Sequence, residues 1–260
     1  MTFPIRRTSP EFKFLLTWRL NNQFRHAGSP IRSGTSLISL PRQVVSRVHP
    51  GLESRRMAIF NLKKREIECK IVYYGPGRGG KTTNLEYIFK KYSKQITGEM
   101  VSINTEGDRT LFFDFLPMGL GKIRGCDIKM QLYTVPGQVQ YSATRKLVLR
   151  GVDGIVFVAD SLEVRREKNM LSLKDLQKNL KEYGLNIFKI PLVLQYNKRD
   201  LAEDGIPLMS IEQMEKDLNR QLKAPAFPGS ATKGTGVGDT LKECAQLTLK
   251  ALQKELQWAQ

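Results

Sequence analysis

The chain has 260 residues, with 42 Lys or Arg against 25 Asp or Glu and a formal net charge of +17 at pH 7. Its 40% hydrophobic content excludes a disordered polyelectrolyte and a fibrous protein, and its length suits one globular domain with an appendage. The three cysteines form no C-x-x-C pair, which argues against a disulfide framework and a zinc site and favours a reducing, cytoplasmic compartment. Because no run approaches about 18 apolar residues, we expect no transmembrane segment.

Residues 1–56 carry much of the positive charge, with ten Lys or Arg and two acidic residues. The segment is rich in Ser and Pro and lacks apolar periodicity, so we expect a basic, disordered extension. It could be an organelle-targeting peptide, a basic arm that touches anionic lipid or nucleic acid, or a stretch upstream of a true start at Met57. The change to a Lys- and Glu-rich, regularly patterned sequence favours the last, with a globular domain over 57–260.

From Met57 onward, short β-rich runs alternate with longer helical patterns. The first strand is expected over 69–74 and the first helix over 81–92, followed by a polar connection over 93–108. Residues 110–116 and 128–135 predict a pair of antiparallel strands joined by a Gly-containing turn.

The second half continues with apolar runs typical of buried strands and with periodic helical segments. Strands are expected over 154–160 and 191–196, and helices over 142–150, 165–183, 210–222 and 237–258. This order predicts an α/β fold in which helices flank a doubly wound, mostly parallel, nucleotide-binding sheet.

The turn after the first strand matches G-x-x-x-x-G-K-[ST], the P-loop pattern, between a strand and a helix. Its residues, with the threonine that follows, are Gly75, Pro76, Gly77, Arg78, Gly79, Gly80, Lys81, Thr82 and Thr83. Glycines let several backbone N–H groups converge on a phosphate, and the helix N-terminus adds partial positive charge. We expect Lys81 to reach the β- and γ-phosphates and Thr82 to ligate Mg²⁺.

An N-K-x-D sequence, Asn197-Lys198-Arg199-Asp200, follows the fifth expected strand. Guanine offers two adjacent N–H donors that one carboxylate, Asp200, can accept, whereas adenine has no such pair. Lys198 can lay its alkyl stem over the purine. Ser230, Ala231 and Thr232 form a loop whose backbone N–H is expected to meet guanine O6. The sequence therefore predicts GTP and GDP as ligands.

Two segments between these motifs are expected to sense the γ-phosphate. In the second, Gly137 can donate its N–H to the phosphate and Gln138 can orient the attacking water. Thr134 stands where small GTPases place an Asp that holds Mg²⁺ through water. Asp114, on the neighbouring strand, could replace that carboxylate or could face solvent.

In the first segment, Thr110 is the candidate to complete the Mg²⁺ shell because it directly precedes a strand. Arg109 beside it could act as an arginine finger in cis or could be a surface arginine.

The residues from about Glu66 to the final helix resemble the bacterial MglA gliding-motility GTPases. The resemblance rests on the runs Ile71–Gly77, Gly98–Ser102, Arg109–Pro117, Leu132–Gln138 and Leu149–Asp160. It implies a Ras-like fold with a six-stranded sheet, and the family shares the threonine at the position of Thr134. It also implies that Arg109 is an intrinsic arginine finger and Gln138 the catalytic glutamine.

The same resemblance implies a GTPase switch with a roadblock-fold activating partner like MglB and with motility or polarity effectors. It implies control of cell polarity and of gliding or type IV pilus motility, by a cytoplasmic protein recruited to a cell pole. Two other hypotheses remain: a scaffold that binds GTP without hydrolysing it, and a nucleic-acid binder. We expect no nucleic-acid partner, because the chain has no recognised nucleic-acid module and the basic excess is concentrated in 1–56.

Overall fold

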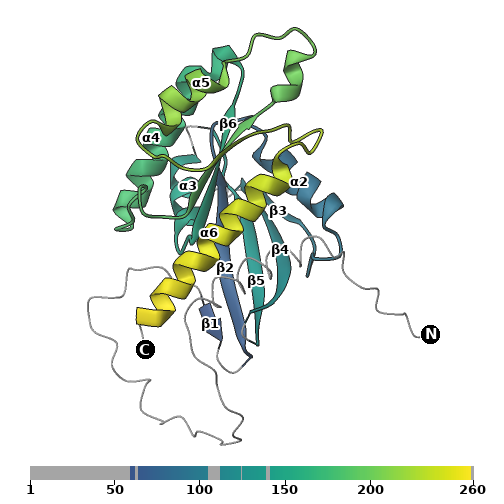
Figure 1. Cartoon of the computed structure of the whole chain (residues 1–260), viewed down its shortest axis with the longest axis vertical. Coiled ribbons are helices and arrows are strands. Elements are labelled where there is room, and N and C mark those ends of the chain that lie inside the picture. The colour runs from purple at the N-terminus through teal and green to yellow at the C-terminus, as the bar shows by residue number, and fades with distance from the viewer. Residues whose placement is uncertain (1–58, 62–63, 105–111, 124, 139–140, 259–260) are drawn as a thin grey trace, which may run out of the picture. The chain divides into compact units, whose positions relative to one another are not determined.

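The centre of the sheet is made of strands that are apolar along most of their length. In the computed structural model, β6 (Gly154–Asp160) and β7 (Leu192–Asn197) are buried at every residue, and so are the last four residues of β2 (Glu66–Tyr74). The structure describes residues 59–61, 64–104, 112–123, 125–138 and 141–258, which belong to one unit spanning Arg56–Gln260. Strands buried on both faces require helices on both sides, and Figure 1 shows this layering.

The described strands form one sheet in the order β3-β4-β5-β2-β6-β7-β8, with β1 (Ile59–Asn61) paired to the start of β2. β4 (Phe112–Ile123) is antiparallel to β5 (Cys126–Thr134) and to β3 (Val101–Asn104). The pairs from β5 through β2, β6 and β7 to β8 (Ala226–Pro228) are parallel. The doubly wound, mostly parallel architecture is confirmed, but the sheet has eight described strands instead of six because β1 and β3 extend it.

The expected polar connection over 93–108 is wrong in its middle, where β3 forms. The run Val-Ser-Ile-Asn alternates apolar and polar residues and pairs with β4 in the register Val101↔Phe115 and Ile103↔Phe113. A run of four residues is too short for a periodic pattern to indicate a strand. Pairing with the edge of β4 determines its strand conformation instead.

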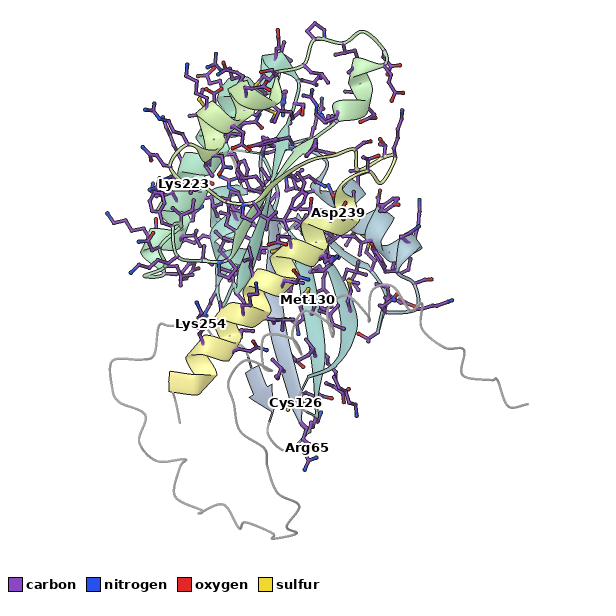
Figure 2. The ribbon with its side chains drawn as sticks, in the orientation of Figure 1. Arg65, Cys126, Met130, Lys223, Asp239 and Lys254 are labelled. Atoms are coloured by element: carbon purple, nitrogen blue, oxygen red, sulfur yellow. The ribbon has the colours of Figure 1, made fainter. Side chains whose placement is uncertain are left out.

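Helices cover both faces of the sheet. α3 (Ser142–Leu149) and α4 (Arg166–Glu182) pack on one face, where Tyr74, Phe157, Leu176 and Leu180 share one buried cluster. α2 (Lys81–Lys91) and α6 (Val237–Trp258) cover the other face (Figure 1). Figure 2 shows Asp239 at the beginning of α6 and Lys254 towards its far end.

The helix expected over 210–222 is shorter and changes type. One α-helical turn, α5 (Ile211–Met214), continues as a π-helical turn at Glu215–Asn219. The Asn219 amide group donates to the carbonyl of Ala224 and accepts from its N–H, both at 2.9 Å. These bonds to the following loop close the segment and replace further helical turns.

Candidate functional site

The P-loop connects β2 to α2 and lies against the ends of two neighbouring strands. A Cβ at Gly75, which has φ of 143°, would lie 2.2 Å from the carbonyl oxygen of Val158 on β6. Gly80 has φ of 97° and precedes α2, and a Cβ there would lie 2.2 Å from Nδ2 of Asn197. Only glycine allows this backbone and this approach, and such a tight loop can bring several backbone N–H groups towards one anion.

Lys81 occupies the first turn of α2 and is 6% exposed. Its Nζ donates to the carbonyl oxygens of Gly75 at 3.0 Å and Pro76 at 2.7 Å. The pKa of Lys81 is lowered to about 7, mainly by burial and then by the positive charges of Arg145 and Arg165, while Asp114 partly offsets this by raising it. A phosphate beside the ammonium group would favour its charged form, so the side chain is suited to an anionic ligand.

Asp114 is buried, not solvent-facing, and lies next to Thr82. Asp114 is 8% exposed. Its Oδ2 accepts hydrogen bonds from the hydroxyl groups of Thr82 at 2.7 Å and Thr134 at 2.8 Å. Its Oδ1 accepts from Oγ of Ser102 at 2.8 Å. Four elements thus contribute to one cluster of oxygen atoms beside the P-loop.

This cluster fits Mg²⁺, which prefers oxygen ligands and keeps several waters. Within the residues that the structure describes, no three or more His, Cys, Asp or Glu side chains gather to hold a metal ion. A carboxylate and a hydroxyl group would therefore have to serve together with phosphate oxygens and water.

Asn197 joins the P-loop to the loop at 230–231. Its Nδ2 donates to the carbonyl of Gly79 at 2.8 Å, and its Oδ1 accepts from the N–H of Ala231 at 2.8 Å. Three of the predicted nucleotide-binding segments are therefore brought together by one buried side chain.

Asp200 and Ser230 meet through Thr232, the third residue of the predicted base loop. Oγ1 of Thr232 donates to Oδ2 of Asp200 at 3.1 Å and lies 3.0 Å from Oγ of Ser230. Asp200 keeps its second carboxylate oxygen outside this bond, so the group retains acceptor capacity for a base.

Asp160 is a second residue that sequence reasoning missed. It ends β6, is fully buried, and pairs with Nζ of Lys198 at 2.6 Å and with Nε of Arg165 at 3.5 Å. Arg165 also donates to the carbonyl of Gly77. The available signal was an acidic residue at the end of an otherwise apolar strand, because parallel strands present their carboxyl ends to a ligand site.

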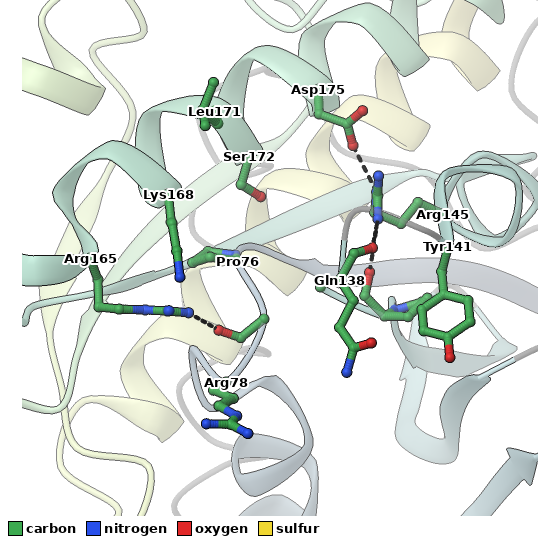
Figure 3. A pocket seen from close by; sticks show the side chains of 13 residues that line it. Pro76, Arg78, Gln138, Tyr141, Arg145, Arg165, Lys168, Leu171, Ser172 and Asp175 are labelled. Carbon is green, nitrogen blue, oxygen red and sulfur yellow. Dashed lines mark hydrogen bonds and ion pairs between the residues drawn. The ribbon is translucent and has the colours of Figure 1, made fainter.

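The segment containing Gly137 and Gln138 lies directly against the P-loop. A Cβ on Gly137 would come 2.2 Å from the N atom of Gly77, so no larger residue fits this approach. Gln138 is exposed at the edge of a cavity of about 790 Å³ that continues between the P-loop, α3 and α4 (Figure 3).

Four basic residues line this cavity: Arg78, Arg145, Arg165 and Lys168. Arg145 and Asp175, which form an ion pair there, were not singled out by the sequence. Arg109 and Thr110 lie outside the described residues, and Thr83 lies in the first turn of α2, where it is partly buried.

This fold and this loop define a small P-loop GTPase. The sequence pattern of the ADP-ribosylation factor family matches residues 56–248, and the chain belongs to that family. No helix in the described part of the chain has the length and apolar character needed to cross a membrane.

The chain is similar to the mutual gliding-motility protein MglA of Myxococcus xanthus. The two sequences are 54% identical over 198 residues, which cover 76% of this chain and 99% of that relative. A second relative, GTP-binding protein rho3 of Schizosaccharomyces pombe, is 29% identical over 201 residues, 74% of this chain and 88% of its own. The expected resemblance to MglA proteins is confirmed.

Proposed function

We propose that this protein is a GTP-hydrolysing molecular switch that acts in cell polarity and motility. The observation that best supports it is the set of contacts through Asn197, which joins the P-loop to the predicted guanine loop. A protein built only to hold a phosphate has no need for a base-specific loop bonded to its phosphate loop. GTP is the substrate, and GDP and phosphate are the products.

The roles follow from the position and chemistry of each residue. The P-loop amides and Lys81 bind the phosphates, Asp200 accepts both guanine donors, and Ser230 and Ala231 flank the base. Gln138 orients the water that attacks the γ-phosphate, and Arg109 supplies positive charge as the phosphate bond breaks.

Thr82, Asp114 and Thr110 are the residues that would hold Mg²⁺, and the hydrogen bond from the Thr82 hydroxyl group to the buried Asp114 carboxylate supports this assignment. When bound, Mg²⁺ neutralises charge on the β- and γ-phosphates. Asp114 then supplies, from β4, the carboxylate that Thr134 cannot provide.

The cellular role is inferred from MglA of Myxococcus xanthus, whose name describes a mutual gliding-motility protein. We propose that the domain over 57–260 switches between GTP and GDP forms in the cytoplasm and is recruited to a cell pole. In this scheme a roadblock-fold partner like MglB accelerates hydrolysis, and the GTP form engages motility or polarity effectors.

GTP turnover by purified residues 57–260, with and without a roadblock-fold protein of the same genome, tests the proposal. Slow intrinsic turnover that the partner accelerates is the expected result. Tight GTP binding without turnover under either condition would contradict it and favour the scaffold that binds GTP without hydrolysing it.

A further inference from the structure

Arg145 is a buried cation between α4 and the segment that carries Gln138. It belongs to α3 and is 6% exposed. Its Nη1 donates to the backbone carbonyl of Gln138 and, at 3.4 Å, to that of Pro136. Figure 3 shows the side chain reaching from α3 to this backbone, with Asp175 on its other side.

Asp175 on α4 anchors the opposite side of the guanidinium group. Oδ2 of Asp175 accepts from Nε of Arg145 at 2.8 Å. The same oxygen accepts from the Tyr74 hydroxyl at 2.5 Å and from Nδ2 of Asn179 at 3.2 Å. A carboxylate with three donors from β2, α3 and α4 is fixed in place, and it therefore fixes the arginine.

The two ends of this arrangement require a guanidinium group. Nε faces the carboxylate while Nη1 faces the carbonyls, so one planar fork makes both sets of bonds. A lysine ammonium group is a point charge on a flexible stem and cannot span both partners in the same way.

We propose that Arg145 is a positioning residue for GTP hydrolysis, which rests on the function proposed above. By holding the carbonyls of Pro136 and Gln138, it fixes the peptide from which the Gln138 side chain extends. Gly137, between the two held carbonyls, is the residue in contact with Gly77 of the P-loop. Arg145 therefore sets the distance between the catalytic glutamine and the phosphate site without touching substrate, and a displacement of about 1 Å is enough to reduce turnover strongly.

The test compares the full chain with Arg145→Lys, using Lys146→Ala as the matched control. Lys146 is the next residue of α3, is exposed and pairs with Glu182, away from segment 134–138. Single-turnover GTP hydrolysis and the Kd for GDP are measured for each protein. We expect Arg145→Lys to lower the rate at least about tenfold with a Kd within about twofold of wild type, and Lys146→Ala to change neither.

A double-mutant cycle with Gln138→Ala separates positioning from a general structural effect. If Arg145 acts through Gln138, Arg145→Lys should cause no further loss in the Gln138→Ala background. Equal fold losses in both backgrounds, or a wild-type rate in Arg145→Lys, would overturn the inference while leaving the proposed function intact.

Asp175→Asn is the second variant, and it decides the question if Arg145→Lys fails to fold. It keeps the shape of the carboxylate but removes its charge, and we expect the same loss of rate with the same dependence on Gln138. Wild-type turnover in Asp175→Asn would also overturn the inference. Absence of GTP turnover in the wild type, with the activating partner present, would instead remove the proposed function itself.

Discussion

Asp114 and Thr134 hold each other across β4 and β5. The Thr134 hydroxyl donates to the Asp114 carboxylate at 2.8 Å and accepts from its backbone N–H at 2.9 Å. The threonine therefore orients a carboxylate that a neighbouring strand supplies. A carboxylate therefore lies beside Thr82 although position 134 is not acidic.

Asp114→Asn is expected to reduce the effect of Mg²⁺ on nucleotide affinity, because an amide keeps the shape but lacks the charge that attracts the ion. We expect the ratio of GDP release rates with and without EDTA to shrink by about tenfold. Ser102→Ala is the control, since it removes one hydrogen bond to Asp114 and leaves the carboxylate. An unchanged ratio in Asp114→Asn would exclude Asp114 from the metal site.

Asp200→Asn tests the assignment of the base. The variant should lose at least about tenfold in GDP affinity and gain affinity for xanthine nucleotides, because an amide cannot accept both guanine donors. Fluorescent-nucleotide titration measures both. Glu203→Gln is a suitable control because this exposed acid nearby pairs with Lys233. Undiminished GDP affinity in Asp200→Asn would contradict the assignment.

At the scale of elements, the packing of α6 on the sheet depends on the absence of a side chain at Gly154. A Cβ there would lie 2.1 Å from Oγ1 of Thr248 and 3.3 Å from Sγ of Cys244. Both neighbours are fully buried in the contact between α6 and β6. Gly154→Ala should therefore lower the free energy of unfolding by about 1–3 kcal/mol.

Chemical denaturation measures this loss, and Thr248→Ala provides the check. Removing the Thr248 hydroxyl group removes the closest clash, so Gly154→Ala combined with Thr248→Ala should lose less than the two single losses added together. Additive losses in the free energy of unfolding would mean that Thr248 is not in the close contact with position 154 that the structure indicates.

Helices and strands with a strong periodic pattern could be predicted from the sequence. Those that depend on contacts with another segment of the chain could not. The apolar run of β6, which ends at Asp160, and the long amphipathic pattern of α6 predicted the observed bounds, Gly154–Asp160 and Val237–Trp258. β3 and the π turn at Glu215–Asn219 depend on β4 and on the loop at Ala224, which no local pattern reports.

The residues of the site likewise differ in whether the sequence could predict them. The P-loop and the N-K-x-D sequence are contiguous, so their residues could be named from spacing alone. Asp160, Arg145 and Asp175 act through charges on separate elements, and only the fold brings these charges together. Arg109 and Thr110 remain predictions.

For the whole molecule, the charge distribution separates the first 56 residues from the nucleotide-binding part. All contacts described for the site involve residues between Tyr74 and Thr232. We expect removal of 1–56 to leave the Kd for GDP unchanged and the Tm of the GDP-bound protein within about 2 °C of the full chain.

Differential scanning calorimetry and nucleotide titration of the full chain and 57–260 measure this. A large drop in Tm would mean that the basic segment stabilises the domain. Nucleic-acid binding by the full chain that disappears in 57–260 would instead revive the nucleic-acid hypothesis.

Asn197 has a kinetic consequence for nucleotide exchange. One buried amide group bonds both the phosphate loop and the base loop, so neither loop can open alone without leaving a polar atom unpaired. Release of the base and release of the phosphates should then occur as a single event, seen as one exponential phase when fluorescent GDP dissociates. An exchange factor would need to displace only one of the two loops to release the whole nucleotide.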